Sequence, residues 1–338
     1  MNGFKSVICL FIVQFIVITS SYAQVGLNKV AQSTMNFLLV SISPEASALG
    51  EATSAMSKGS ESIFNNPAGI VESENQFDIK LYVTQWIADI NYMAGAATWN
   101  MGIYGSVGFS ILTVDYGDIY GTSLLSLAEI DMYPAGYKDL GVMDNVGAYA
   151  VGLTYGKAVS EKFLIGGSIR LIGQSLGRTI KNNTTVDNDA SKLAFDAGVK
   201  YYTGLKSFRF GMAIRNFASN IKREEIDEQL PLSFSMGAAF DLFDIFIPDH
   251  TPDNTLNLSV DFVHPNNYSE RVNLGVEYRF WSMIALRAGY QTNRDLASWS
   301  AGIGINSAIA GNDIEFNYSY SSFDIFDDVN RFSLGFAF

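Results

Sequence analysis

The chain has few side chains that could carry out acid–base, nucleophilic or metal chemistry. Its two histidines, His250 and His264, fall in expected connections between strands, and their settings do not suggest a catalytic triad or a metal-ligand spacing. Asp324, Asp327 and Asp328 could hold a calcium ion, since carboxylates suit hard cations, or could form a solvated acidic loop. We therefore expect a protein that is not an enzyme and that has neither a cofactor nor a metal site.

Other charged residues recur singly on the polar faces of alternating segments. They are Arg170, Lys200, Arg209, Arg215, Arg271, Arg279 and Arg287, set against Asp196, Asp261, Glu277 and Glu315. In a barrel they form either a neutralised ladder that fixes a plug or the lining of a polar conduit. An ion-selective pore would favour one sign of charge, so the mixture of signs favours the ladder.

Alternating strands must position these charges. In the last segment Phe332, Leu334, Phe336 and Phe338 share one face, and small or polar residues share the other. One apolar face and a terminal phenylalanine resemble the closing strand and the insertion signal of an outer-membrane barrel. The same alternation predicts fourteen strands, at 76–85, 89–100, 102–116, 145–158, 162–177, 191–203, 207–218, 230–244, 254–264, 269–280, 282–291, 297–307, 312–322 and 329–338.

The connections agree with this topology. Short turns should alternate with longer outer loops, which fall at 117–144, 178–190, 219–229 and 323–328, and one inner turn, 245–253, is longer than expected. All four tryptophans fall near strand ends, as aromatic belts require: Trp86 and Trp299 at the outer end, Trp99 and Trp281 at the inner end. A soluble sandwich would alternate equally well, but would carry more than 17% charged residues on its surface.

The N-terminus predicts export. Lys5, the apolar run 7–18 and small residues at 21 and 23 describe a signal peptide over residues 1–23, which contains Cys9, the chain's one cysteine. Removal of Lys5 changes the net charge from −12 to −13, which argues against nucleic acid as a partner. We expect a protein of the Gram-negative outer membrane, in contact with outer-membrane lipid.

Residues 24–75 do not alternate, and they predict a plug segment before a barrel over 76–338. A helix is expected over residues 44–56, with Ser43 as its N-cap and with Ala46, Leu49, Gly50 and Ala52 among its residues. A turn follows at Asn65, Asn66, Pro67, Ala68 and Gly69. This turn either anchors the plug or is an ordinary turn before the first strand.

Together these segments resemble the PorV/PorQ family, which belongs to the wider group of FadL-like barrels. The resemblance is carried by residues 43–52, 64–69, 82–92 and 114–118, and by Phe338; it departs at Ala46-Ser47, where family members often have Ala-Arg. It implies an all-β, FadL-like, fourteen-stranded antiparallel transmembrane barrel with a short N-terminal helical plug. It also implies a role in type IX protein secretion, with secretion-system components and C-terminal domains of secreted cargo as partners.

Two functions follow as hypotheses. The first is a binding and scaffolding barrel of type IX secretion or a related surface-export process. The second is a FadL-like channel for hydrophobic small molecules, which needs an apolar route, whereas the predicted lumen faces are mainly Gly, Ser, Asn and paired charges. Loop 117–144 is the candidate partner site or, alternatively, a lid over the barrel mouth; its apolar and aromatic residues include Tyr120, Leu124, Leu125, Met132, Tyr133 and Tyr137.

Overall fold

A computed structural model describes residues 33–73, 75–181, 184–223, 226–247, 253–294, 298–309, 311–323 and 326–338. The expected signal peptide, His250 and Asp324 lie outside these ranges. Among the described residues, no helix is long and apolar enough to cross a membrane.

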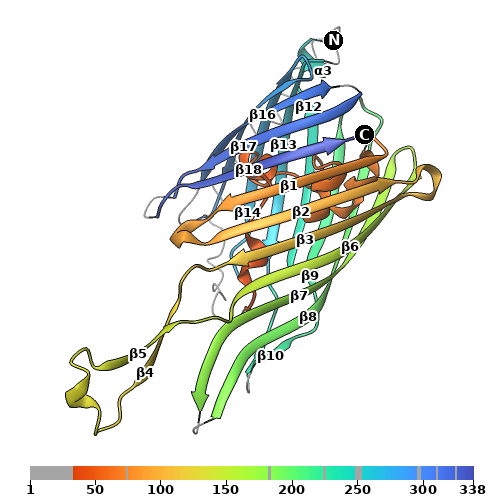
Figure 1. Ribbon diagram of the computed structural model, residues 1–338. Coiled ribbons are helices and arrows are strands. Elements are labelled where there is room, and N and C mark those ends of the chain that lie inside the picture. Colours follow the sequence, from red (N-terminus) through yellow and green to blue (C-terminus); the bar gives the residue numbers. More distant parts are fainter. Residues whose placement is uncertain are drawn as a thin grey trace.

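Fourteen antiparallel strands form a closed barrel, which confirms the predicted fold (Figure 1). In barrel order these are β1 (Phe77–Gln85), β2 (Asn91–Asn100), β3 (Ser106–Asp115), β6 (Val146–Ser160), β7 (Phe163–Lys181), β8 (Thr184–Tyr202), β9 (Arg209–Phe217), β12 (Ser233–Asp241), β13 (Thr255–Pro265), β14 (Arg271–Phe280), β15 (Ile284–Gln291), β16 (Trp299–Ile309), β17 (Asn312–Ser321) and β18 (Val329–Ala337).

The barrel closes where β18 pairs with β1. Phe77 and Phe338 exchange backbone hydrogen bonds of 2.8 and 2.9 Å, and their rings stack at 5.4 Å. As predicted, the side chains of Phe332, Leu334 and Phe336 point outward, whereas Arg331 and Ser333 are buried inside. The role of the terminal phenylalanine in insertion stays a prediction.

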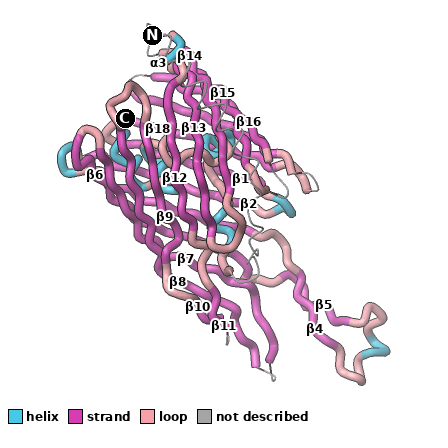
Figure 2. The backbone as a smooth tube through the Cα atoms, turned by 180° about the vertical axis from the view of Figure 1, so that it is seen from behind, coloured by secondary structure: helices cyan, strands magenta, loops and turns pink. Residues whose placement is uncertain are grey.

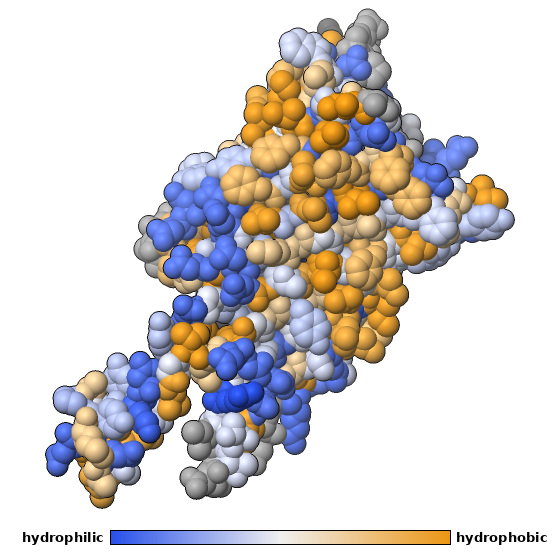
Figure 3. Space-filling view, viewed as in Figure 1, coloured by the Kyte–Doolittle hydropathy of each residue, from blue (hydrophilic) through white to orange (hydrophobic). Residues whose placement is uncertain are grey.

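Apolar side chains cover the outside of the strands (Figure 3). Such an outer surface suits lipid, because each strand turns alternate side chains outward. Trp99, Trp281 and Trp299 are exposed near strand ends, as expected for aromatic belts. Trp86 is an exception to the prediction: its ring lies inside against Tyr92 and Phe323, below the Arg331 guanidinium.

The outer loops contain more strand than predicted. Most of the expected loop 178–190 continues β7 and β8, because backbone pairing beyond the membrane needs no apolar face. Loop 117–144 holds β4 (Tyr120–Leu124), the 3-10 helix η7 (Ile130–Met132) and β5 (Tyr137–Val142), and loop 219–229 holds β10 (Ile221–Arg223) and β11 (Ile226–Glu228). His264 also lies within a strand, β13, not in a connection.

The N-terminal segment lies inside the barrel (Figure 1). Its helix α2 covers only Pro44–Ala48, so the predicted helix over 44–56 was too long. Of the predicted helix residues, Ala46 is helical, Leu49 is the C-cap, and Gly50 and Glu51 have φ of +60° and +61°. Because positive φ ends a right-handed helix, the chain turns there, and Ala52 follows outside regular secondary structure. Ser43 caps α2 as predicted, accepting from the Ala46 amide at 3.1 Å.

Three short 3-10 helices complete this segment: η2 (Asn36–Leu39), η3 (Gly59–Phe64) and η4 (Pro67–Glu72). Helix α2 packs against β15–β18, η3 against β1–β3, and η4 against β3 and β6–β8. In the tube view these elements lie within the ring of strands (Figure 2).

Candidate functional site

The N-terminal segment runs through the lumen from one end of the barrel to the other. We call the end where β1 stops the outer end, because the extra hairpins β4–β5 and β10–β11 lie there. Ser33 is at this end: it forms a bridge with Gln229 and accepts a 2.8 Å hydrogen bond from Asn267. Asn75 is at the inner end, where it donates to Asp313 at 3.0 Å. We treat the segment in two parts, the leg (residues 33–42) and the anchored segment (residues 43–73).

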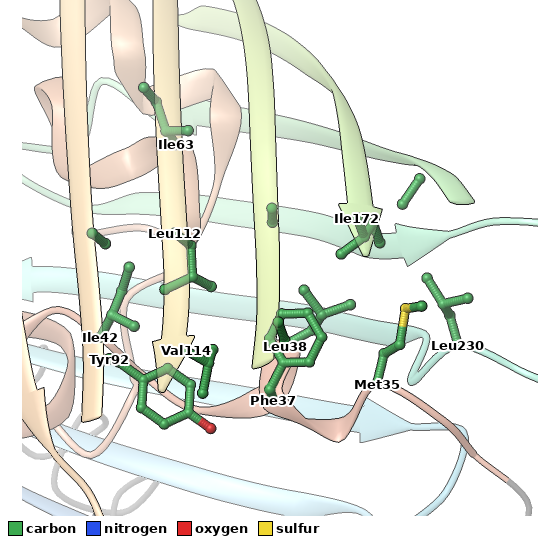
Figure 4. Packing of buried hydrophobic residues seen from close by; sticks show 14 of the residues in the cluster. Met35, Phe37, Leu38, Ile42, Ile63, Tyr92, Leu112, Val114, Ile172 and Leu230 are labelled. Atoms are coloured by element: carbon green, nitrogen blue, oxygen red, sulfur yellow. The ribbon is translucent and has the colours of Figure 1, made fainter. Parts of the chain in front are cut away.

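The leg fills an apolar region of the inner wall that sequence analysis missed. Barrel register places Ala94, Leu112, Ala150 and Ile172 side by side across β2, β3, β6 and β7. We define the apolar chamber as the buried inner-wall residues Tyr92, Ala94, Leu112, Val114, Ala148, Ala150, Ile172 and Ala194. Four leg side chains occupy it: Met35, Phe37, Leu38 and Ile42 (Figure 4). The inner wall therefore has a sizeable apolar part beside the predicted Gly, Ser, Asn and paired charges.

The sequence did contain a signal for this chamber. Residues 92–94 and 111–112 are apolar on both faces of their strands, whereas a polar lumen requires alternation.

The anchored segment is fixed by its predicted turn. Asn66 is fully buried, and its amide group donates to the Ser54 carbonyl at 2.7 Å and to the Val199 carbonyl on β8 at 3.1 Å. Its oxygen accepts from the Ala68 amide at 3.1 Å, with Pro67 in the first turn of η4. Gly198 permits this approach, since a Cβ atom there would lie 2.0 Å from the Asn66 oxygen. The turn thus contacts both the plug and the wall, and its role as an anchor stays a prediction.

A buried charge network holds α2 against the wall. Lys80 on β1 lies 2.6 Å from Glu45 and 2.8 Å from Glu315. Arg287 lies 2.7 Å from Glu277 and 3.7 Å from Glu45. Lys80 was absent from the predicted set, but the arrangement matches the predicted neutralised ladder, because opposite charges meet across the plug and wall.

Glu61 extends this network from η3. It accepts from the Ser43 hydroxyl at 2.6 Å. Burial, and then the neighbouring Glu45 carboxylate, raises the pKa of the Glu61 carboxyl well above its usual value of 4.5.

Other cationic side chains of the wall donate hydrogen bonds to backbone carbonyls of the anchored segment. Arg209 donates to the Ala55 carbonyl at 3.1 Å, Arg215 to the Phe64 carbonyl at 2.6 Å, and Lys200 to the Ser57 carbonyl at 2.9 Å. Lys200 also pairs with Glu72. These residues were predicted to face the lumen, and the structure shows what they bind there. Of the other predicted charges, Arg170 pairs with Asp196 at 2.7 Å, and Asp261 accepts from the Ser54 amide at 2.8 Å.

Glu51 lies near several arginines at the junction of the two parts. Arg294 approaches it at 3.3 Å. Burial alone would raise the pKa of the Glu51 carboxyl, but Arg294, Arg271 and other arginines outweigh burial and lower it. Glu51 therefore stays ionised, and its contact with Arg294 binds the junction of the leg and the anchored segment to the wall.

Cavities flank the anchored segment on both its outer and inner sides. One of about 60 Å³ lies beside the leg, lined partly by Leu38, Phe64 and Arg215. The other, of about 610 Å³, lies toward the inner end and has many charged residues in its lining, among them Lys80 and Arg279. An apolar patch of the inner wall thus lies beside the leg, on β2, β3, β6, β7 and β8, and a polar cavity lies toward the inner end.

The predicted partner loop forms a hairpin that projects away from the barrel (Figures 1 and 2). Pairs Tyr120–Val142 and Leu124–Tyr137 lie on one face of the β4–β5 ladder. Leu124 is 95% exposed, and Tyr120, Met132 and Tyr137 are also exposed, whereas Leu125 and Tyr133 are half-buried. The alternative prediction, a lid folded over the barrel mouth, does not describe this arrangement.

Histidine and acidic residues form no metal cluster in the part of the chain that the structure describes. His264 lies 3.2 Å from Glu270, and both are exposed.

Comparison with known proteins shows the fold. No protein-family model and no curated protein matches the sequence. Among solved structures, the CymD monoaromatic hydrocarbon channel is 12% identical, with a TM-score of 0.54 over 89% of this chain and 98% of that one. The P. putida toluene transporter TodX is 12% identical, with a TM-score of 0.56 over 87% of this chain and 98% of that one. The chain has a FadL-like barrel fold. At this identity the FadL-like fold alone is shared, and the resemblance to PorV/PorQ stays unconfirmed.

Proposed function

We propose that this protein is an outer-membrane channel for hydrophobic small molecules, with the apolar chamber as the site that receives them. The observation that carries this proposal is a buried apolar surface on the inner wall of the barrel. Two proteins of similar fold are described as a monoaromatic hydrocarbon channel and a toluene transporter, which supports the same class of substrate.

The chamber is chemically suited to such a substrate. Binding sites for small molecules are concave and mostly apolar. Met35, Phe37, Leu38 and Ile42 contribute only side-chain carbon and sulfur atoms to the chamber, so an aromatic or aliphatic molecule could take their place. These four side chains make no hydrogen bond in the part of the chain that the structure describes, so their removal leaves no polar partner of those side chains unsatisfied. Moving Ile42 does separate its carbonyl from the Thr84 hydroxyl.

Uptake of radiolabelled toluene by Gram-negative cells that express the protein tests the proposal. Leu112→Asp places a carboxylate in the apolar chamber and should reduce protein-dependent uptake several-fold. Asn306→Asp places one in the polar inner cavity and should leave uptake near that of the parent. Heat-modifiable migration establishes that each barrel is folded, and Leu112→Asn serves if the aspartate variant does not assemble. Equal uptake by parent and folded chamber variants would refute the proposal.

A scaffolding role in type IX secretion or related surface export is a second candidate, favoured by the exposed apolar face of the β4–β5 hairpin. A free two-stranded hairpin is marginally stable, and exposed apolar patches often mark contacts. Shortening residues 120–140 should then abolish co-purification of a secreted partner while the barrel still assembles. Retained partners would exclude the hairpin as the contact.

A further inference from the structure

The leg is bound to the wall by far weaker polar chemistry than the anchored segment. It contains no charged residue, so it makes no ion pair. Its polar contacts with the wall include three near the outer rim, from Thr34 to Gln229 and from Asn267 to Ser33 and Asn36. Deeper in the lumen, its carbonyls accept from Arg331 at 2.7 Å and from Thr84 at 3.3 Å.

The leg also contains a strained residue near the outer mouth. Met35 has φ of +55°, a left-handed conformation that is costly for a residue other than glycine. Ser33 lies beside Gln229 and Asn267, which belong to the outer connections between β9 and β12 and between β13 and β14. A path out of the lumen for the leg therefore leads to the cell surface, away from the ion pairs of the anchored segment.

We infer that the leg is a removable stopper, withdrawn through the outer mouth to open the apolar chamber while the anchored segment stays in place. This inference rests on the proposed function, since the opened chamber is the proposed substrate site. The withdrawn leg would leave Leu112 and Ile172 facing free space, with α2, η3 and η4 still bound to the wall. The stopper thus opens toward the cell-surface side of the barrel.

A cysteine pair can lock the leg at the rim. The chain's one cysteine, Cys9, lies in the expected signal peptide, so introduced pairs would be the only thiols of the processed protein. Ser33→Cys with Asn267→Cys joins side chains that now approach within 2.8 Å. The matched control, Ser60→Cys with Asp78→Cys, joins the anchored segment to β1 at a contact of the same length.

Hydrogen exchange measures leg movement without reference to transport. In the reduced rim pair, amides of residues 35–42 should exchange at least about tenfold faster than the anchored amides of Ser54, Ser60 and Ala68. Oxidation of the rim pair should slow exchange of the leg at least about tenfold. Oxidation of the control pair should leave exchange of the leg unchanged. Toluene uptake through the same proteins should fall on oxidation of the rim pair and recover with reductant.

Hydrogen exchange and toluene uptake together distinguish a failure of the stopper proposal from a failure of the channel proposal. Slowed leg exchange without toluene uptake in any form would uphold the stopper and refute the channel. Leg exchange that does not respond to the rim cross-link, or uptake undiminished by it, would overturn the stopper.

Discussion

The leg and the anchored segment share one lumen but are held there by opposite chemistry. The leg packs Phe37 and Leu38 against an apolar wall, whereas the anchored segment places Glu45 and Asn66 in networks with buried partners. Apolar packing is non-directional, so another apolar group can replace it. A buried ion pair cannot be separated without leaving a charge uncompensated. Another apolar group can therefore replace the leg in the lumen, whereas none can replace the anchored segment.

The free energy of apolar burial agrees with this difference between the leg and the anchored segment. Burial of each large apolar side chain contributes about 1.5–3 kcal/mol, so the four leg side chains together contribute roughly 6–12 kcal/mol. That is enough to keep the chamber closed when it is empty of substrate. A hydrophobic substrate recovers part of the same free energy on entering, which lowers the cost of opening.

The largest effect should come from breaking the charge network of the anchored segment. Lys80→Met leaves Glu45 and Glu315 without their shared cation, and we expect the free energy of unfolding to fall by about 3–5 kcal/mol. Urea unfolding followed by tryptophan fluorescence measures the change. Arg178→Met is the control, because Arg178 pairs with Asp187 on the exposed β7–β8 hairpin and should contribute about 0–1 kcal/mol. Equal losses of unfolding free energy in Lys80→Met and Arg178→Met would contradict the difference drawn between the leg and the anchored segment.

A smaller effect is expected at the turn. Replacing Asn66 and Pro67 with alanine leaves buried carbonyl and amide groups without partners, at a cost of about 1–3 kcal/mol. The anchored segment should loosen and single-channel conductance should rise, while the barrel still assembles. Asn188→Ala, on the exposed β7–β8 hairpin, should not change conductance. Unchanged conductance in the folded turn variant would show that the turn does not anchor the plug.

The smallest effect concerns pH. The folded protein holds the Glu61 proton more tightly than the unfolded chain does, because the pKa of Glu61 is raised by burial and by Glu45. The stability that Glu61 contributes should therefore be greatest below pH 4.5 and be lost as pH rises through its raised pKa. Glu61→Gln removes this ionisation, so its Tm should fall less than that of the parent between pH 4 and pH 8. Parallel Tm profiles would contradict this assignment.

The fold could be predicted because the barrel repeats a simple local rule. Alternation along each strand, as at Phe332, Leu334 and Phe336, is visible without knowledge of the neighbours. The extent of α2 was not visible in the same way, because Gly50 and Glu51 end the helix where they meet β15 and the wall arginines.

The site was less accessible to prediction because its partners are distant in sequence. Lys80 meets Glu315, and Arg331 meets Ser41, only after the barrel has closed around the plug. The apolar chamber could have been suspected from residues 92–94, but the segment that fills it could not. Only the register between β2, β3, β6 and β7 brings Leu112 and Ile172 to the same surface as Phe37.

The most direct test of the central claim is a crystal structure of the protein soaked in 4-bromotoluene, with bromine located by anomalous scattering. We expect bromine between Leu112 and Ile172, in place of the Phe37 and Leu38 side chains. The leg should be displaced toward the outer mouth, and residues 43–73 should be unmoved. Bromine found only on the lipid-facing surface, with Phe37 still in the chamber, would contradict the account.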